Sequence, residues 1–179
     1  MAEGEADDRQ PEALSNRAVS SGGSSDAFAV PIDQTEREDV LATIRELFSA
    51  GGPRGREDAI RDVAHALGYG RVGSRIHKVV GIDLQTAVRR GILENVGGRY
   101  SLLCRTIGDY TLDHLVEMLT AAMGPEWQRR DQATTAAARH LGFRRTGQRI
   151  QAAFKSAINA AIRRGLVECD GPRLVRRVR

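Results

Sequence analysis

Two segments of the chain, residues 71–78 and 144–159, carry side chains that can hold or read a nucleic acid. Arginine pairs with the edge of guanine, glutamine and asparagine pair with adenine, and arginine or lysine neutralises a phosphate. The candidate DNA-binding residues in these segments are Arg71, Arg75, His77, Lys78, Arg144, Arg145, Gln148, Arg149, Gln151, Lys155 and Asn159. Arg99 and Arg173 join them because each follows a predicted hairpin turn.

Patterns typical of catalysis or metal binding are missing from the sequence. It has neither the GxxxxGK[ST] signature of a phosphate-binding loop nor the HExxH signature of a zinc protease. The four histidines and two cysteines show neither CxxC nor HxxxH spacing, so we expect no structural zinc site. Both lysines, Lys78 and Lys155, fall in predicted helices rather than beside a strand carboxylate. We therefore predict a non-enzymatic protein without a metal or cofactor.

The candidate residues belong to an internal duplication. Residues 61–100 align with residues 135–174 without a gap, at an offset of 74 positions. Both copies contain Leu-Gly followed by an aromatic residue, then Gly-x-Arg-Ile, then Arg-Arg-Gly. Such agreement in one frame indicates two copies of one structural unit.

The elements that position these residues have the order helix, helix, turn, helix, hairpin. In the first copy, apolar periodicity predicts helices over residues 36–50, 56–67 and 74–90 and strands over 92–96 and 99–103. Thr35 and Glu38 have the spacing of a capping box. Gly97-Gly98 supplies the positive φ angles of a type I′ hairpin turn.

The second copy repeats this order. It predicts helices over residues 112–123, 130–141 and 147–164, and strands over 166–169 and 172–175. The turn between those strands is Asp170-Gly171. Because Pro172 has no amide hydrogen to donate, we expect its strand at the edge of the sheet.

This order is that of a winged helix-turn-helix. The predicted fold class is mainly α with small β-hairpins (α+β): tandem winged helix-turn-helix domains over residues 35–105 and 106–179. In such a domain the N-terminal face of the last helix enters the major groove of DNA. Residues 1–34 are rich in small and acidic residues, so we predict a disordered tail. Its end could be pinned to the first domain by Phe28, Val30 and Ile32.

Charge is spread unevenly along the chain. Residues 1–35 hold seven acidic residues and two arginines, residues 36–105 have a net charge of +3, and residues 106–179 have a net charge of +6. A basic body suggests a polyanionic partner, for which the acidic tail could compete. The alternative is a solvated surface shaped by codon bias, because arginine outnumbers lysine by 25 to 2.

Several features bear on where the protein resides. Cys104 and Cys169 occupy non-equivalent positions and form no disulfide framework, so we expect a reducing compartment. The acidic N-terminus is unlike a signal peptide, and no apolar run reaches the length of a membrane span. We therefore predict a cytoplasmic protein without a membrane partner.

The repeated pattern GP…LGfxRxGxRI…RRG resembles a winged-helix-like domain of unknown function at the C-terminus of large bacterial DNA-helicase-like proteins. The first copy matches it at Gly52-Pro53, Leu67-Gly68-Tyr69, Arg71, Gly73, Arg75-Ile76 and Arg89-Arg90-Gly91. The second matches it at Gly124-Pro125, Leu141-Gly142-Phe143, Arg145, Gly147, Arg149-Ile150 and Arg163-Arg164-Gly165. The resemblance implies a nucleic-acid context. This chain departs from that setting because it carries the domain twice and has no helicase portion.

The predicted function is DNA binding by tandem winged-helix domains, in transcription control or as an accessory factor in DNA processing or defence. The more basic second copy is the expected reader, and a pseudo-dimer that reads two half-sites as a monomer with internal pseudo-symmetry is possible. The alternative is an adaptor that docks a protein of a helicase or nuclease complex. It would expose an apolar patch around Val79, Trp127 or Phe154. Arg75 and Arg149 could instead form ion pairs or caps within their domains.

Overall fold

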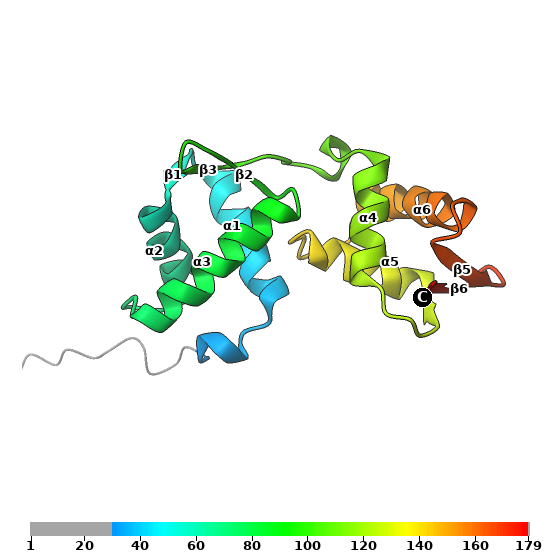
Figure 1. Cartoon of the computed structure of the whole chain (residues 1–179), viewed down its shortest axis with the longest axis horizontal. Coiled ribbons are helices and arrows are strands. Elements are labelled where there is room, and N and C mark those ends of the chain that lie inside the picture. Colours follow the sequence, from blue (N-terminus) through cyan, green and yellow to red (C-terminus); the bar gives the residue numbers. More distant parts are fainter. Residues whose placement is uncertain (1–29, 179) are drawn as a thin grey trace, which may run out of the picture.

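The computed structural model of the protein describes residues 30–178. Of the tail predicted over residues 1–34, only positions 30–34 are described. The rest of the tail, Phe28 included, lies outside the described residues. The described chain forms six α-helices and two three-stranded antiparallel sheets (Figure 1), which confirms the mixed α and β class. No helix within residues 30–178 is both long and apolar enough to cross a membrane.

The helices and strands occur in the same order in two halves of the chain, each with a sheet of its own. The first half contains η2 (Ile32–Gln34), α1 (Arg37–Ala50), β1 (Arg54–Gly55), α2 (Arg56–Ala66), α3 (Ser74–Arg89), β2 (Leu93–Val96) and β3 (Arg99–Leu102). The second half contains η3 (Ile107–Asp109), α4 (Leu112–Ala122), β4 (Gln128–Arg129), α5 (Arg130–His140), α6 (Gln148–Arg163), β5 (Val167–Asp170) and β6 (Leu174–Arg177). The predicted helices are confirmed to within about two residues at their ends.

Each sheet contains a two-residue strand that the sequence did not predict. The strand order is β1-β3-β2 in the first half and β4-β6-β5 in the second. β6 is thus the central strand, so the prediction that the strand of Pro172 lies at the sheet edge is wrong. β6 begins at Leu174, and Pro172 lies in the turn before it. Its missing amide hydrogen therefore removes no hydrogen bond between strands.

The ends of the helices show where local signals hold and where they fail. Gly91 and Gly165 follow α3 and α6 with φ angles of 66° and 68°, as expected for a helix-ending glycine. The capping box predicted at Thr35 and Glu38 is wrong, because α1 has Glu36 as its N-cap with no side-chain cap bond. Thr35 instead donates to the carbonyl oxygen of Pro31 and ends η2.

Each half has a hydrophobic core of its own. The first core includes Phe48, Leu84 and Ile32, so the predicted anchoring of the N-terminal segment by Ile32 is confirmed. Val30 is exposed, and its carbonyl oxygen accepts a hydrogen bond from the Tyr69 hydroxyl. The second core is built around the stripe of α6 that contains Phe154. These cores fix α3 and α6 with one face inward and leave the opposite face to solvent.

The two halves meet where α1 packs against the end of α5 (Figure 1). Arg45 of α1 is buried there, with 5% of its surface exposed. Its Nε donates to the carbonyl oxygen of Leu141 at 2.9 Å and its Nη1 to that of Cys104 at 2.7 Å. Around it, Arg144 pairs with Glu46 at 2.7 Å. The halves are therefore joined by specific polar contacts.

The interface joins non-equivalent surfaces of the two halves. α1 of the first half contacts α5 of the second, whereas within residues 30–178 no contact of similar extent joins their counterparts, α4 and α2. A two-fold pseudo-dimer requires both. The halves are therefore joined through non-equivalent surfaces, and a pseudo-dimer that reads two half-sites stays a prediction.

Candidate nucleic-acid interface

α6 exposes a polar face that carries no acidic residue. The helix begins after Gly147 and packs Phe154 and Ile158 into the core. Its outer face presents Gln148, Arg149, Gln151 and Lys155 as exposed side chains, with Asn159 half-buried below them. Neither Arg149 nor Lys155 has an ionic or hydrogen-bonding partner in the described part of the chain.

The equivalent face of α3 is largely occupied by contacts within the first half. Arg75 pairs with Asp33 of η2, and His77 pairs with Glu57 of α2 at 2.9 Å. Lys78 and Arg71 are exposed and have no partner among residues 30–178. The ion pair considered from the sequence thus exists at Arg75, while Arg149, at the equivalent position of the second half, has none among residues 30–178.

The remaining candidates divide between the surface and internal contacts. Arg145 and Arg173 are exposed, and their side chains have no partner among the described residues. Arg144 serves the interface between the halves, because its Nη2 also donates to Thr43 of α1 at 3.0 Å. Arg99 donates through Nη2 to the carbonyl oxygen of Pro53 at 3.0 Å. Arg145 and Arg173 therefore join Arg149 and Lys155 as exposed cations of the second half, although Arg145 lies beside Arg45 and Glu46 at the interface with α1.

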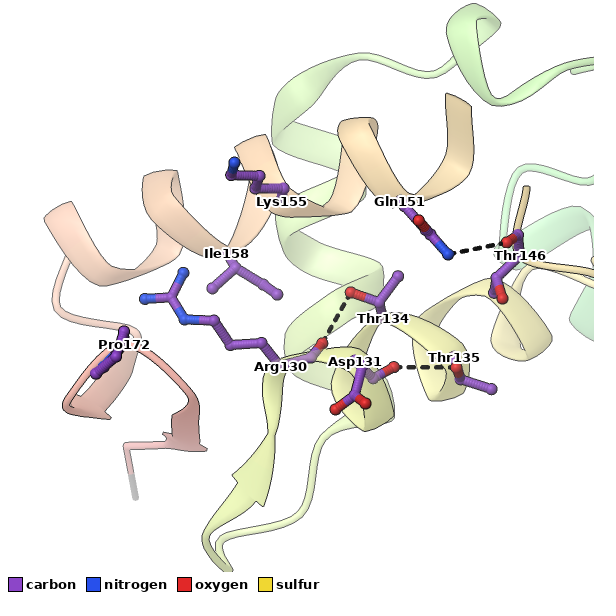
Figure 2. A pocket seen from close by; sticks show the side chains of 9 residues that line it. All are labelled: Arg130, Asp131, Thr134, Thr135, Thr146, Gln151, Lys155, Ile158 and Pro172. Carbon is purple, nitrogen blue, oxygen red and sulfur yellow. Dashed lines mark hydrogen bonds between the residues drawn. The ribbon is translucent and has the colours of Figure 1, made fainter. Parts of the chain in front are cut away.

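A groove of about 520 Å³ runs between α5 and α6 (Figure 2). Its walls are formed by Arg130, Asp131, Thr134 and Thr135 of α5, by Gln151, Lys155 and Ile158 of α6, and by Thr146 and Pro172 from the adjoining turns. In Figure 2, Arg130 extends from the start of α5 toward Ile158 and Pro172. Two predicted residues, Gln151 and Lys155, thus line the same groove as a cation that was not predicted.

Arg130 is the residue of this groove that sequence reasoning missed. Its Nη1 donates to Oδ1 of Asn159 at 3.0 Å, and its Nε is buried without a hydrogen-bond partner among the described residues. It aligns with Arg56 in the duplication, and each of them is the first residue of its helix. An arginine at the first position of both helices is the sequence feature that could have identified Arg130.

One acidic group lies on the rim of the groove. The hydrogen bond from the Arg129 side chain lowers the pKa of Asp131, so this carboxylate is ionised at neutral pH. Its Oδ1 accepts from Arg129 Nε at 3.0 Å and from the amide of Gln132 at 3.1 Å. The charge of Asp131 is therefore balanced by Arg129. Arg130 and Lys155 then make the net charge of the groove positive.

The residues named for the adaptor alternative differ in exposure. Phe154 is fully buried and Val79 packs at the edge of the first core. Trp127 is 41% exposed, and the Arg176 guanidinium lies 4.6 Å from its ring centre. In the described residues, no three histidine, cysteine or acidic side chains gather as metal ligands would.

Comparison with known proteins returns no match to a family model, to a curated protein or to a solved structure. The resemblance to the helicase-associated domain therefore stays a prediction.

Proposed function

We propose that the protein is a non-enzymatic DNA-binding protein built from two winged helix-turn-helix repeats, and that α6 of the second repeat contacts the DNA. The observation that carries the proposal is the exposed face of α6, where Arg149 and Lys155 have no acidic partner among the described residues. Such a protein would act in transcription control or as an accessory factor in DNA processing or defence.

The order of elements supports this assignment. In the second half the chain runs α4, β4, α5, α6, β5, β6, and the three strands form one antiparallel sheet. α6 is then the recognition helix, and the β5–β6 turn is the wing. Arg173 lies in that turn and is exposed, where it can reach a phosphate or the minor groove.

The distribution of charge also favours the second half. Residues 106–179 have a net charge of +6 against +3 for residues 36–105. In the first half, Asp33 and Glu57 lie beside Arg75 and His77 and offset the positive potential of α3. Because contacts to phosphates supply most of the non-specific affinity for DNA, the second repeat is the stronger binder.

Fluorescence anisotropy with a labelled duplex of about 30 base pairs tests the proposal. Affinity is measured over a salt series for the wild type and for the Arg149→Glu, Lys155→Glu double variant. The matched control is Arg75→Glu, Lys78→Glu, which changes the net charge equally but alters α3. We expect log-linear loss of affinity with salt, collapse of binding in the α6 variant and a smaller loss in the control. A folded wild type that does not bind at low salt would overturn the proposal.

An adaptor function is the second candidate, and the apolar side chains of the second half favour it. Trp127, Leu166 and Val178 are 41%, 43% and 37% exposed. Leu166 and Val178 line one further groove of about 450 Å³. An adaptor predicts no duplex binding at low salt, so the same anisotropy experiment separates the two functions.

A further inference from the structure

The duplication allows the α5–α6 groove to be compared with its counterpart between α2 and α3. At the offset of 74 residues, Arg130 corresponds to Arg56 and Lys155 corresponds to Gly81. Asp131 and Gln151 correspond to Glu57 and His77. The two grooves therefore share their backbone frame and differ in the side chains that line it.

In the first half, side chains fill the space between α2 and α3 that corresponds to the groove. His77 Nε2 lies 2.9 Å from Glu57 Oε2, so a side-chain hydrogen bond spans α3 and α2. The Arg56 guanidinium occupies the position where a longer side chain at residue 81 would lie, because a Cβ on Gly81 would be 2.9 Å from Arg56 Nη2. Gly81 is buried as a result.

In the second half, the corresponding side chains turn away from one another. Gln151 donates to the carbonyl oxygen of Thr146 at 3.2 Å, and Asp131 is bound by Arg129. Lys155 replaces the glycine and is exposed. No bridge between α5 and α6 forms at these two positions, and the groove of about 520 Å³ stays open.

The charge of Arg130 is not matched by a carboxylate. Its side chain is hydrogen-bonded to the neutral amide of Asn159 at 3.0 Å, and it has no acidic partner in the described chain. The residue is half-buried and its Nε is fully buried without a partner among residues 30–178. A cation that is partly removed from water favours an anion nearby.

We propose that the α5–α6 groove binds a phosphate group of a nucleic-acid strand, held by Arg130 and Lys155. The inference rests on the proposed function and adds a backbone contact beside the recognition helix. Arginine suits phosphate because its planar group offers several donors, and lysine adds a mobile point charge.

The neutral side chains of the groove leave the two cations as its main donors. The hydroxyls of Thr134 and Thr135 already donate to the carbonyl oxygens of Arg130 and Asp131, at 2.9 and 3.0 Å. The groove is also much larger than a phosphate group, so it has room for the sugars on either side. These features favour a strand that passes through the groove.

The test uses the full chain and two changes that act on the groove in different ways. Lys155→Gln removes one cation. The double variant Asp131→Glu, Gln151→His copies the histidine–glutamate contact of the first half and closes the groove, with no change in formal charge when the histidine is neutral. Arg163→Gln is the matched control, because Arg163 is an exposed cation of α6 outside the groove with no partner in residues 30–178.

Duplex anisotropy over a salt series gives the first readout. We expect Lys155→Gln to weaken binding about fivefold and to reduce the salt slope by about 0.9, the value for one lost phosphate contact. The groove-closing variant should also weaken binding, whereas Arg163→Gln should change it less than either. Duplex binding by the groove-closing variant that equals that of the wild type would overturn the inference, and it would leave the proposed function intact because Arg149 and Lys155 are unchanged in that variant.

Titration of ¹⁵N-labelled protein with inorganic phosphate at constant ionic strength gives the second readout. Saturable shifts of the Arg130 Nε–H and of the amides of Thr134 and Thr135, weakened by Lys155→Gln, support an anion site. If these shifts occur but the wild type binds no duplex, the proposed DNA binding fails. The natural ligand of the groove is then the phosphate group of a small molecule. If neither occurs, both proposals fail.

Discussion

The guanidinium carbon of Arg45 lies 4.0 Å from the centre of the Phe143 ring, so a side chain of the first half stacks on one of the second. The same guanidinium donates to Tyr110 Oη and to the carbonyl oxygens of Leu141 and Cys104. Burial raises the pKa of Tyr110 to about 12, so its hydroxyl stays neutral through the physiological range. One buried arginine therefore makes the central polar contacts between the two halves, beside those of Arg144 and Arg90.

Replacing Arg45 should destabilise the protein strongly. Arg45→Met keeps an unbranched apolar stem but leaves the carbonyl oxygens of Leu141 and Cys104 buried without their donor. We expect a loss of about 3 kcal/mol in the free energy of unfolding, measured by urea denaturation. Glu46→Gln is the control, because the Glu46–Arg144 pair is exposed and should contribute less than about 1 kcal/mol. Equal effects of the two changes would contradict the role of Arg45.

Gly142 and Gly68 form a matched pair for measuring the tightness of this interface. Both have positive φ angles, 74° and 92°. A Cβ on Gly142 would lie 2.8 Å from the carbonyl oxygen of Leu41, whereas a Cβ on Gly68 would meet nothing within 4 Å.

Gly68→Ala should therefore cost only backbone strain, about 1 kcal/mol. Gly142→Ala should cost roughly 2 kcal/mol more, because the backbone of α1 has to move. Thermal or urea unfolding of both variants measures the difference. Identical losses would mean that α1 does not pack on this turn in solution.

His140 should make stability depend on pH. Burial, together with the charge of Arg90, lowers the pKa of His140 to about 4, while the unfolded chain has a value near 6.5. The unfolded state therefore binds more protons between these values, and stability falls as the pH drops from about 6.5 to about 4.

Between these pH values, the free energy of unfolding should fall by on the order of 2 kcal/mol because of His140. His140→Gln removes the titrating group but keeps the carbonyl oxygen that accepts from Arg90 Nη1 at 2.9 Å. The difference in unfolding free energy between wild type and variant, measured at several pH values, should shrink as the pH falls. A difference that is independent of pH would show that His140 is not buried in its neutral form.

Local sequence signals predicted the elements of the fold but not how they assemble. Apolar periodicity found the six α-helices of residues 30–178, and Gly91 marked the end of α3 because a positive φ angle is a local requirement. The strands β1 and β4 are two residues long, too short for a period to appear, and they exist only because a hairpin from the far end of each half pairs with them. The capping box predicted at Thr35 does not form, because Thr35 ends η2 and its hydroxyl donates to the carbonyl oxygen of Pro31.

The candidate site was predicted in part for the same reason. The exposed cations of α6 could be found from helical spacing alone. Arg144 has the same local sequence context as Arg145, yet it binds Glu46 of α1, and this contact depends on how the halves pack. Arg130 was missed because its role arises from the groove between two helices.

The two copies offer one more comparison, between Arg75 and Arg149. They are equivalent in the duplication, and both are exposed. Arg75 is beside Asp33, which cancels much of its attraction for a phosphate even though an exposed pair contributes little to folding. Arg149 lies on a helix face without acidic residues. We expect Arg149→Ala to weaken duplex binding about fivefold and to lower the salt slope by about 0.9.

Arg75→Ala should change duplex affinity by less than about twofold, because its charge is already offset. Asp33→Asn extends the comparison by removing that offset, and it should strengthen binding if the first half also lies near the DNA. All three variants keep the cores intact, so circular dichroism should show wild-type melting. Equal losses for Arg75→Ala and Arg149→Ala would mean that both halves contact DNA alike and would remove the proposed preference for α6.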